Sequence, residues 1–282
     1  MGEPVAGQQN GFDSGFLRRH QLALPRLDPT LEADIAPTVT GEAVRRYTHF
    51  SLQMSASRRF CRWVAWNIDG TQVRSLARGG FRFDPVYDRS VQVGDEIYQH
   101  NEIDRGHIAR RADVTWGSDV EAGQANADSM FFTNITPQAV DFNQPLPNTE
   151  NKGLWGELEN TVLDEIAALD DRRLSVFGGP VLDPDDFPFK DVLIPLSFWK
   201  IVAYSELVRL RARAFVLTQH DLEHRVREAV WGDFSVYGHQ IAALQDMIAI
   251  DFGPLVDADV FPQDAPAPVR RISSRAEVIS DT

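Results

Sequence analysis

Residues 104–107 read Asp-Arg-Gly-His, and this stretch indicates more about the fold than any other part of the chain. About 30 residues further on come Asn134-Ile135-Thr136-Pro137-Gln138 and then Asn143-Gln144. Trp155 and Leu158-Glu159 follow these motifs along the chain. A histidine base, a carboxamide that can bind a metal, an arginine and a carboxylate are the groups that hydrolyse a phosphodiester.

The order of these motifs resembles the DNA/RNA non-specific endonuclease family, the ββα-metal or His-Me finger nucleases related to endonuclease G. The resemblance runs from about Tyr47 to about Phe252. It implies an α+β fold with a mixed or antiparallel sheet, flanking helices and a ββα-metal motif at the active site. It also implies that the chain is an enzyme, a DNA/RNA non-specific endonuclease.

The four residues of the first motif are expected to have different roles. Histidine titrates near neutral pH, as a base that activates water must, and the resemblance implies that His107 is this general base. Arg105 can lie on the same side of a strand as His107 and is expected to bind phosphate; a surface salt bridge, for example to Asp104, is the alternative. Asp104 is expected to orient the loop or the arginine. Gly106 is expected to provide backbone freedom or close approach.

The predicted cofactor is Mg²⁺, with Mn²⁺ as a substitute, since one protein oxygen and the substrate phosphate suffice to hold a hydrated ion. The resemblance implies that an asparagine is the ligand. Asn143 lies nine residues after Asn134, as in the family, but residues 145–150 then interrupt the family motif. Asn151 lies eight residues before Glu159, which is about 12 Å along a helix. Asn143 is favoured as the ligand, and Asn151, otherwise a helix cap, is the second candidate.

Two further residues are expected to support the site. The string from Trp155 to Glu159 implies that Glu159 is the acidic residue of the family, which binds a water of the metal rather than the ion. Asn134 is expected to be a polar residue near the base.

Three arginines are candidates for binding substrate. Arg78 and Arg82 lie 29 and 25 residues before His107, where the family commonly has a basic residue that contacts phosphate. Arg78 is preferred of the two. Arg110 follows the motif directly and is expected, like Arg111, to line the groove. Exposed surface charge is the alternative for all of them.

The composition sets limits on function. The chain has 282 residues and a formal net charge of −13, which by itself disfavours nucleic acid. Its cations, however, are 25 arginines and only three lysines, and arginine binds phosphate through a flat, two-pronged contact. A basic cleft on an acidic body fits this bias, as does a GC-rich genome that encodes Arg in place of Lys. Cys61 is the single cysteine, so internal disulfides and four-cysteine zinc sites are excluded, and it is expected to be buried.

The chain is predicted to contain one main domain with additions at both ends. Residues 1–45 are expected to form an N-terminal extension, residues 46–256 the nuclease domain, and residues 257–282 a flexible tail. Hydrophobic periodicity predicts strands at 47–54, 60–68, 131–133, 174–177, 192–194, 198–204 and 212–218, and helices at 118–130, 151–169 and 235–250.

The predicted function is metal-dependent hydrolysis of DNA and RNA without sequence preference, through contacts to backbone phosphate. One alternative is a catalytically impaired nucleic-acid-binding protein on the same fold, since the stretch between Asn143 and Trp155 is altered. The other is a phosphodiesterase for small nucleotides. An inhibitor protein is an expected partner, and a homodimer is a further option because relatives form them.

Residues 1–30 contain no apolar signal-peptide core, and no stretch approaches a membrane span. A soluble protein without a membrane partner is therefore expected. It would be cytoplasmic, or exported by a route that needs no such signal.

Overall fold

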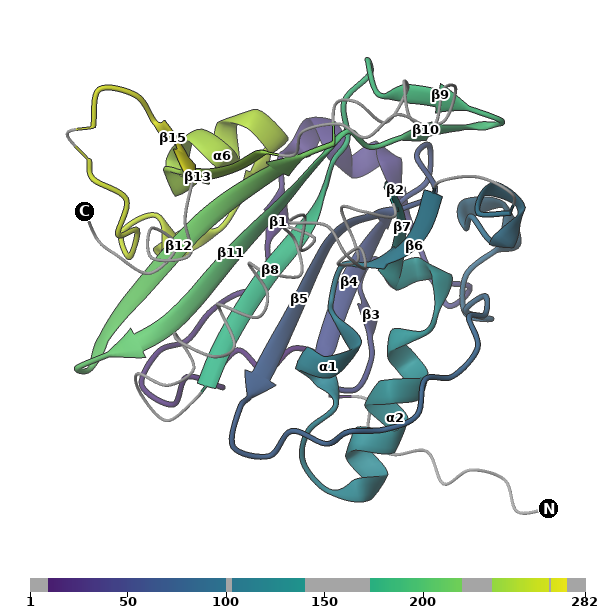
Figure 1. Cartoon of the computed structure of the whole chain (residues 1–282), viewed down its shortest axis with the longest axis horizontal. Helices are drawn as coiled ribbons and strands as arrows, with labels where there is room; N and C mark the ends of the chain where they lie inside the picture. The colour runs from purple at the N-terminus through teal and green to yellow at the C-terminus, as the bar shows by residue number, and fades with distance from the viewer. Residues whose placement is uncertain (1–9, 100–102, 140–172, 220–234, 264, 273–282) are drawn as a thin grey trace, which may run out of the picture.

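The computed structural model describes residues 10–99, 103–139, 173–219, 235–263 and 265–272. Its largest feature is a nine-stranded sheet in the order β15-β13-β12-β11-β8-β5-β4-β2, with β3 also paired to β4 (Figure 1). Every pairing within this sheet is antiparallel. The strands are β2 (Ile35–Ala36), β3 (Arg45–Arg46), β4 (Phe50–Ser55), β5 (Cys61–Asp69), β8 (Arg173–Val181), β11 (Ser197–Glu206), β12 (Arg209–Thr218), β13 (Ser235–His239) and β15 (Val269–Ile272).

The central strands are buried on both faces because other elements cover each side of the sheet. All nine residues of β5 are buried. Successive side chains of a strand point to opposite faces. Val64 and Trp66 therefore belong to one apolar core, while Trp63 and Ala65 belong to the other.

The first face of the sheet is covered by α1 (Arg111–Val114), α2 (Asp119–Ser129) and the paired strands β6 (Ile103–His107) and β7 (Ile135–Ala139) (Figure 1). Ser118 and Glu121 begin α2 with a capping box, in which each side chain bonds the other residue's backbone N–H. The 3₁₀ helix η4 (Phe132–Asn134) then leads directly into β7. This layer contains the Asp-Arg-Gly-His motif.

The second face is covered by α6 (Ile241–Ile248) and by the N-terminal residues Phe12, Phe16 and Leu22. Two short strands, β1 (Arg26–Leu27) and β14 (Ile250–Asp251), pair beside it. Residues from the N-terminal segment thus pack into the second core, while Ala36 of β2 belongs to the first core. The remaining short elements are η1 (Pro29–Asp34), η2 (Arg89–Val91), η3 (Asp95–Ile97), η6 (Gly253–Leu255) and the hairpin β9 (Phe187–Phe189) with β10 (Val192–Ile194).

The predicted α+β class with an antiparallel sheet and flanking helices is confirmed. Two predicted elements are wrong. Residues 131–133 are not a strand, because the chain turns there into η4. The helix predicted from 235 begins only at Ile241, because Ser235–His239 pairs with β12 as β13. The helix predicted at 151–169 lies outside the described residues.

The C-terminal region departs from the flexible tail that was expected. Val269–Ile272 forms β15, which pairs with β13 and extends the main sheet. The local composition is rich in Pro and Asp, but β15 gains backbone hydrogen bonds from an open sheet edge, which composition does not reveal.

No helix among the described residues is long and apolar enough to cross a membrane. Cys61 is fully buried, as predicted, and burial raises the pKa of its thiol to about 12.

Candidate active site

The site is built on the β6–β7 pair. In its register His107 lies opposite Ile135, and Gly106 lies opposite Thr136. Side chains alternate along a strand, and residues directly opposite each other share a face. Arg105 and His107 therefore point to one face of the pair, whereas Asp104 and Gly106 belong to the other.

The aromatic ring of Phe81 gathers three of the predicted site residues. Its centroid lies 5.6 Å from the ring of His107, 5.5 Å from Cζ of Arg105 and 4.9 Å from Cζ of Arg78. Phe81 belongs to the loop after β5, more than 20 residues before β6. The structure thus brings the predicted base and two predicted phosphate-binding residues around one side chain that the sequence argument left out. The interleaving of Arg and Phe in residues 78–83 was the available signal.

His107 is held as a neutral imidazole. Its ring is half-buried, and Nε2 is shielded from solvent with no hydrogen-bond partner among the described residues. The pKa of His107 is lowered to about 3, mainly by burial and then by the charges of Arg78, Arg111 and Arg110, while the charge of Asp104 partly opposes this shift. A neutral imidazole can accept a proton at neutral pH, which is the state that a general base requires.

Asn134 holds the chain just after the base. Its Oδ1 accepts a hydrogen bond from the N–H of Ala109 at 2.9 Å, and its Nδ2 donates to the carbonyls of Ala109 at 2.9 Å and Ser129 at 3.2 Å. Asn134 is fully buried, and both ends of its amide are occupied by backbone. It therefore fixes the segment that follows His107 and is placed to act through the backbone rather than on the substrate.

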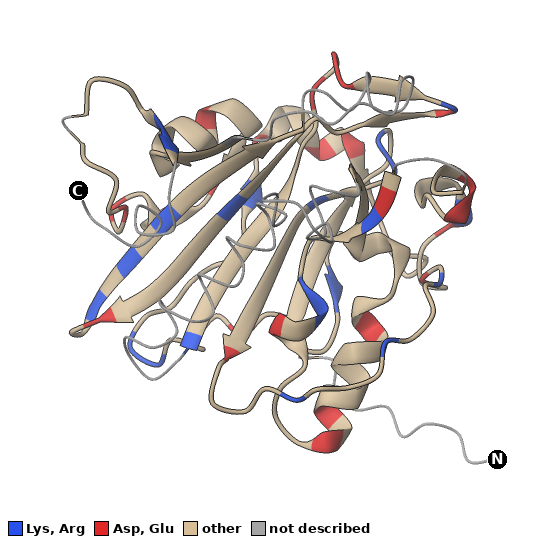
Figure 2. Cartoon of the chain, in the orientation of Figure 1, with Lys and Arg blue, Asp and Glu red and all other residues tan. Residues whose placement is uncertain are grey.

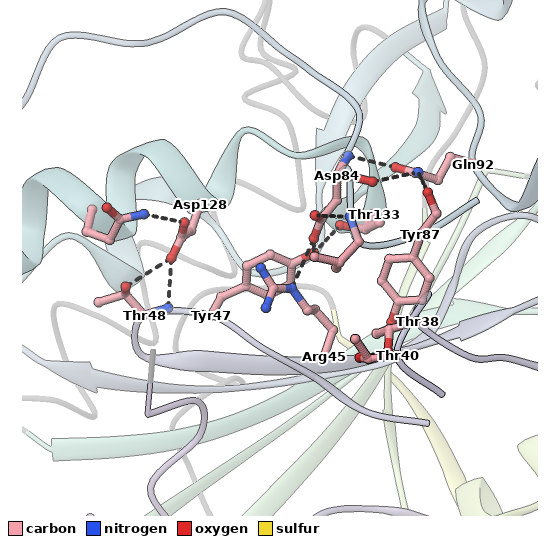
Figure 3. Close-up of polar contacts among 12 residues, drawn as sticks. Thr38, Thr40, Arg45, Tyr47, Thr48, Asp84, Tyr87, Gln92, Asp128 and Thr133 are labelled. Atoms are coloured by element: carbon pink, nitrogen blue, oxygen red, sulfur yellow. Dashed lines mark hydrogen bonds and ion pairs between the residues drawn. The ribbon is translucent and has the colours of Figure 1, made fainter. Parts of the chain in front are cut away.

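A buried polar network supports η4, which contains Asn134 (Figure 3). The hydroxyl of Tyr47 lies 2.5 Å from Oδ2 of Asp84 and 2.7 Å from Oγ1 of Thr133, and Nε of Arg45 donates to Asp84 at 3.1 Å. Burial, followed by the charge of Asp84, raises the pKa of Tyr47 well above its usual range, so the phenol stays protonated. These residues connect β3 to η4, and no sequence motif marked them.

Gly106 is needed because the side chain of Gln138 packs directly against this position. A Cβ atom on Gly106 would lie 2.1 Å from Cδ of Gln138. Gln138 is fully buried, and neither atom of its amide has a hydrogen-bond partner in the described part of the chain. Any side chain at position 106 would push Gln138 away from β6.

Arg105 is paired with a residue that was not predicted. Its Nε donates to Oδ1 of Asp95 at 2.8 Å, and its Nη2 lies 2.6 Å from the same oxygen. Asp104 instead accepts a hydrogen bond from the backbone N–H of Arg105 at 2.8 Å. The side-chain salt bridge to Asp104 that was considered from the sequence is therefore replaced by one to η3.

The other predicted arginines divide into two groups. Arg110 and Arg111 both act on the pKa of His107 and so lie near it. Arg111 Nη1 also donates to the carbonyl of Leu76 at 2.8 Å and to Oδ1 of Asn126 at 3.2 Å, which ties the Arg78 loop to α2. Arg82 is placed differently: its guanidinium stacks 4.1 Å from the ring centroid of Phe131 and is not gathered around Phe81 with the other arginines.

The predicted metal ligand Asn143, its alternative Asn151 and the predicted acid Glu159 lie outside the described residues. Within the described ranges, no three His, Cys, Asp or Glu side chains gather so that they could hold a metal ion. A hydrated Mg²⁺ needs as little as one protein oxygen, so a site built on one carboxamide would not produce such a cluster.

A hollow of about 780 Å³ lies away from this site. Its lining includes Val216 and Ile250 of the second core, with Tyr237 and His239 of β13 and Ile248 of α6. None of the described residues predicted to act in catalysis or substrate binding lines it.

Comparisons with known proteins identify the family of the chain. The family model for DNA/RNA non-specific endonucleases matches residues 28–259. The uncharacterized protein y4fB of Sinorhizobium fredii is 36% identical over 229 residues, which is 76% of this chain and 33% of that protein. A nuclease of Nostoc sp. is 30% identical over 156 residues, covering 54% of this chain and 51% of the relative. The chain thus spans about a third and about half of the lengths of these two relatives.

The fold is also found among solved structures. A crystal structure of the EndoG/EndoGI complex matches with a TM-score of 0.60 at 14% identity, covering 89% of this chain and 94% of that one. At this identity the match shows the fold alone. The family model, which covers most of the sequence and both strands of the β6–β7 pair, establishes that the chain belongs to the DNA/RNA non-specific endonuclease family.

Proposed function

We propose that the chain is a metal-dependent endonuclease that hydrolyses phosphodiester bonds of DNA and RNA without sequence preference. The observation that carries this proposal is the placement of His107 as a neutral imidazole beside the guanidinium groups of Arg78 and Arg105, around the ring of Phe81. Family membership supports the same reaction class.

In the proposed reaction, His107 takes a proton from a water molecule, and the resulting hydroxide attacks phosphorus. The new P–O bond forms as the bond to the 3′ oxygen breaks. The leaving oxygen takes a proton from solvent, so the products are a 3′ hydroxyl and a 5′ phosphate. Arg78 and Arg105 offset the negative charge that grows on the phosphoryl oxygens in the transition state.

The cofactor of this reaction is proposed to be Mg²⁺, with Mn²⁺ as a substitute. Asn143 would hold the ion, and Glu159 would bind one of its waters. When bound, the ion supplies Lewis-acid stabilisation of the transition state. Asn134 and Asp104 are proposed as positioning residues for the motif, and Arg110 as a further phosphate contact.

The role of His107 is tested by the His107→Ala variant on plasmid DNA and on RNA with Mg²⁺ present. Removal of a general base is expected to lower the rate by roughly 10²–10⁴-fold. His239→Ala, which alters a histidine outside this site, is the matched control and is expected to retain activity. Equal cleavage by wild type and His107→Ala would remove His107 from the mechanism.

The choice between the two asparagines needs a separate experiment. Asn143→Ala is expected to abolish cleavage at low Mg²⁺ and to recover partly at high Mg²⁺, whereas Asn151→Ala should affect stability more than metal dependence. The reverse result would assign the ion to Asn151.

The same assays separate the two alternative functions. Binding of DNA in chelator with no cleavage in Mg²⁺ or Mn²⁺ would indicate a catalytically impaired binding protein. Cleavage of small cyclic or linear nucleotides without cleavage of polymers would indicate a phosphodiesterase for small substrates. The neutral, shielded imidazole favours turnover over binding alone.

We also propose partners for this chain from its similarity to a solved structure. One solved neighbour is EndoG in a complex with EndoGI, described as showing the mechanism of EndoG inhibition, and we propose that an inhibitor protein also binds this chain. A homodimer stays a prediction, which the mass measured by light scattering would check.

A further inference from the structure

Arg105 is held by a carboxylate at the edge of the proposed site. Oδ1 of Asp95 accepts a hydrogen bond from Nε at 2.8 Å and lies 2.6 Å from Nη2, so one oxygen occupies one edge of the guanidinium. The side chain of Arg105 is 26% exposed and that of Asp95 is 52% exposed. The exposed carboxylate of Asp95 therefore contacts the arginine that is proposed to bind phosphate.

The position of the guanidinium does not depend on Asp95 alone. Cζ of Arg105 lies 5.0 Å from the ring centroid of Tyr98 and 5.5 Å from that of Phe81. Both rings in turn contact Phe132, with centroid distances of 6.5 Å and 5.9 Å. Because aromatic side chains from three segments hold the group in place, loss of the carboxylate would remove a charge and leave the guanidinium where it is.

On the basis of the proposed function, we propose that Asp95 competes with nucleic-acid phosphate for Arg105 and thereby weakens product binding. Carboxylate and phosphate oxygens both accept charge-assisted hydrogen bonds from the N–H groups of arginine. Two negative groups placed close together also repel each other. The product has a terminal 5′ phosphate, whose second ionisation near neutral pH adds negative charge that a diester lacks. Asp95 therefore disfavours the product more than the substrate.

The neighbouring acid of η3 makes a similar pair elsewhere. Glu96 Oε1 lies 3.3 Å from Nη2 of Arg89, whose Cζ stacks 3.5 Å from the ring centroid of Phe83. Of these two pairs, only that of Asp95 contains an arginine of the Asp-Arg-Gly-His motif. The effect is thus assigned to Asp95.

The test is the Asp95→Asn variant of the full chain, which removes the charge and keeps the shape of the side chain. We expect KM for DNA and the inhibition constant of a 5′-mononucleotide to fall roughly two- to fivefold, the range for an exposed ion pair. The inhibition constant should fall more than KM. The single-turnover cleavage rate at saturating protein should stay at the wild-type value.

Asp251→Asn is the matched control. Asp251 is also exposed and paired with an arginine, Arg26, and it belongs to the β1–β14 pair at the second face of the sheet, so the variant makes the same change in net charge away from Arg105. Asp95→Ser serves as a second variant in case asparagine makes new hydrogen bonds to Arg105.

The outcomes separate the possible errors. A fall in the single-turnover rate with KM unchanged would overturn the proposal, since Asp95 would then orient Arg105. Equal shifts for the variants at 95 and 251 would overturn it as well, because the effect would be one of net charge. If the wild-type protein cleaved no polymer, this result would contradict the proposed function but not the proposal for Asp95. Titration of wild type and Asp95→Asn with the 5′-mononucleotide would still measure whether Asp95 weakens phosphate binding.

Discussion

At the scale of single residues, the site depends on which charged groups surround one imidazole. Arg78 and Arg111 lower the pKa of His107 in addition to its burial, and Asp104 acts in the opposite direction. Under the proposed function, Arg78 also contacts phosphate. The same basic setting would then attract the substrate and keep the imidazole unprotonated.

This setting predicts an unusual pH dependence. The pKa of a free histidine is about 6.5, but the pKa of His107 in the folded chain is about 3. The acid limb of kcat/KM should therefore lie well below pH 6, and a limb centred near pH 6.5 would contradict this environment. The measurement is kcat/KM against pH at constant ionic strength and saturating metal.

The same shift affects stability. Between pH 6.5 and pH 3 the unfolded chain binds a proton at His107 and the folded chain does not, so folding stability falls as the pH is lowered through this range. Above pH 6.5 the group contributes no pH dependence. His107→Ala should thus lose less Tm than wild type between pH 7 and pH 4, and identical losses would contradict the shift.

At the scale of elements, the β6–β7 pair places the motif and α2 with η4 supports it. Gly106 lets Gln138 pack directly on β6, and Asn134 ties the residues after His107 to the end of α2. The Tyr47–Asp84–Thr133 network then connects this layer to the edge of the main sheet. The base is therefore held through three contacts that are remote in sequence.

The close approach at Gly106 yields a stability prediction. Gly106→Ala should destabilise the fold by roughly 1–3 kcal/mol, because its Cβ would overlap the buried side chain of Gln138 and displace it. Cleavage should fall with it, since β6 contains His107 and Arg105.

Gly123→Ala in α2 is the control for that variant. A Cβ at position 123 meets nothing within 4 Å, so alanine should stabilise the helix by about 1 kcal/mol. Chemical denaturation of both variants gives the comparison, and equal effects would show that the contact with Gln138 is not what matters.

At the scale of the whole molecule, a net charge of −13 must be reconciled with the nucleic-acid substrate proposed above. Acidic and basic residues are both spread over many elements, and α2 has acids near both of its ends (Figure 2). Many described arginines are already paired with acids, as Arg45 is with Asp84 and Arg58 with Asp186. If the chain binds nucleic acid as proposed, we therefore expect the attraction to be local to the site.

A local site predicts a weak salt dependence. With Arg78, Arg105 and Arg110 as the phosphate contacts, the slope of log K against log salt for duplex DNA should be about −3. Fluorescence anisotropy in chelator measures it without cleavage. A slope of −6 or steeper would require a broad basic surface and would contradict the local site.

Much of the fold was predictable because its signals are local. The apolar runs at residues 60–68 and 198–204 predicted β5 and β11, and the helix expected at 118–130 corresponds to α2. The β13 strand was missed because five residues before a helix owe their conformation to pairing with β12. β15 was missed for the same reason, as its partner is an edge of the sheet.

The sequence by itself determined the family, the α+β class and the residues of the Asp-Arg-Gly-His motif, since these depend on contiguous residues and on periods of two and 3.6. Tertiary structure decided that Phe81 gathers His107, Arg105 and Arg78, and that Arg105 pairs with Asp95. These contacts join loops that are separated along the chain, and their geometry is fixed only when the layer packs on the sheet. Local propensity contains no information about which of 25 arginines will meet which acid.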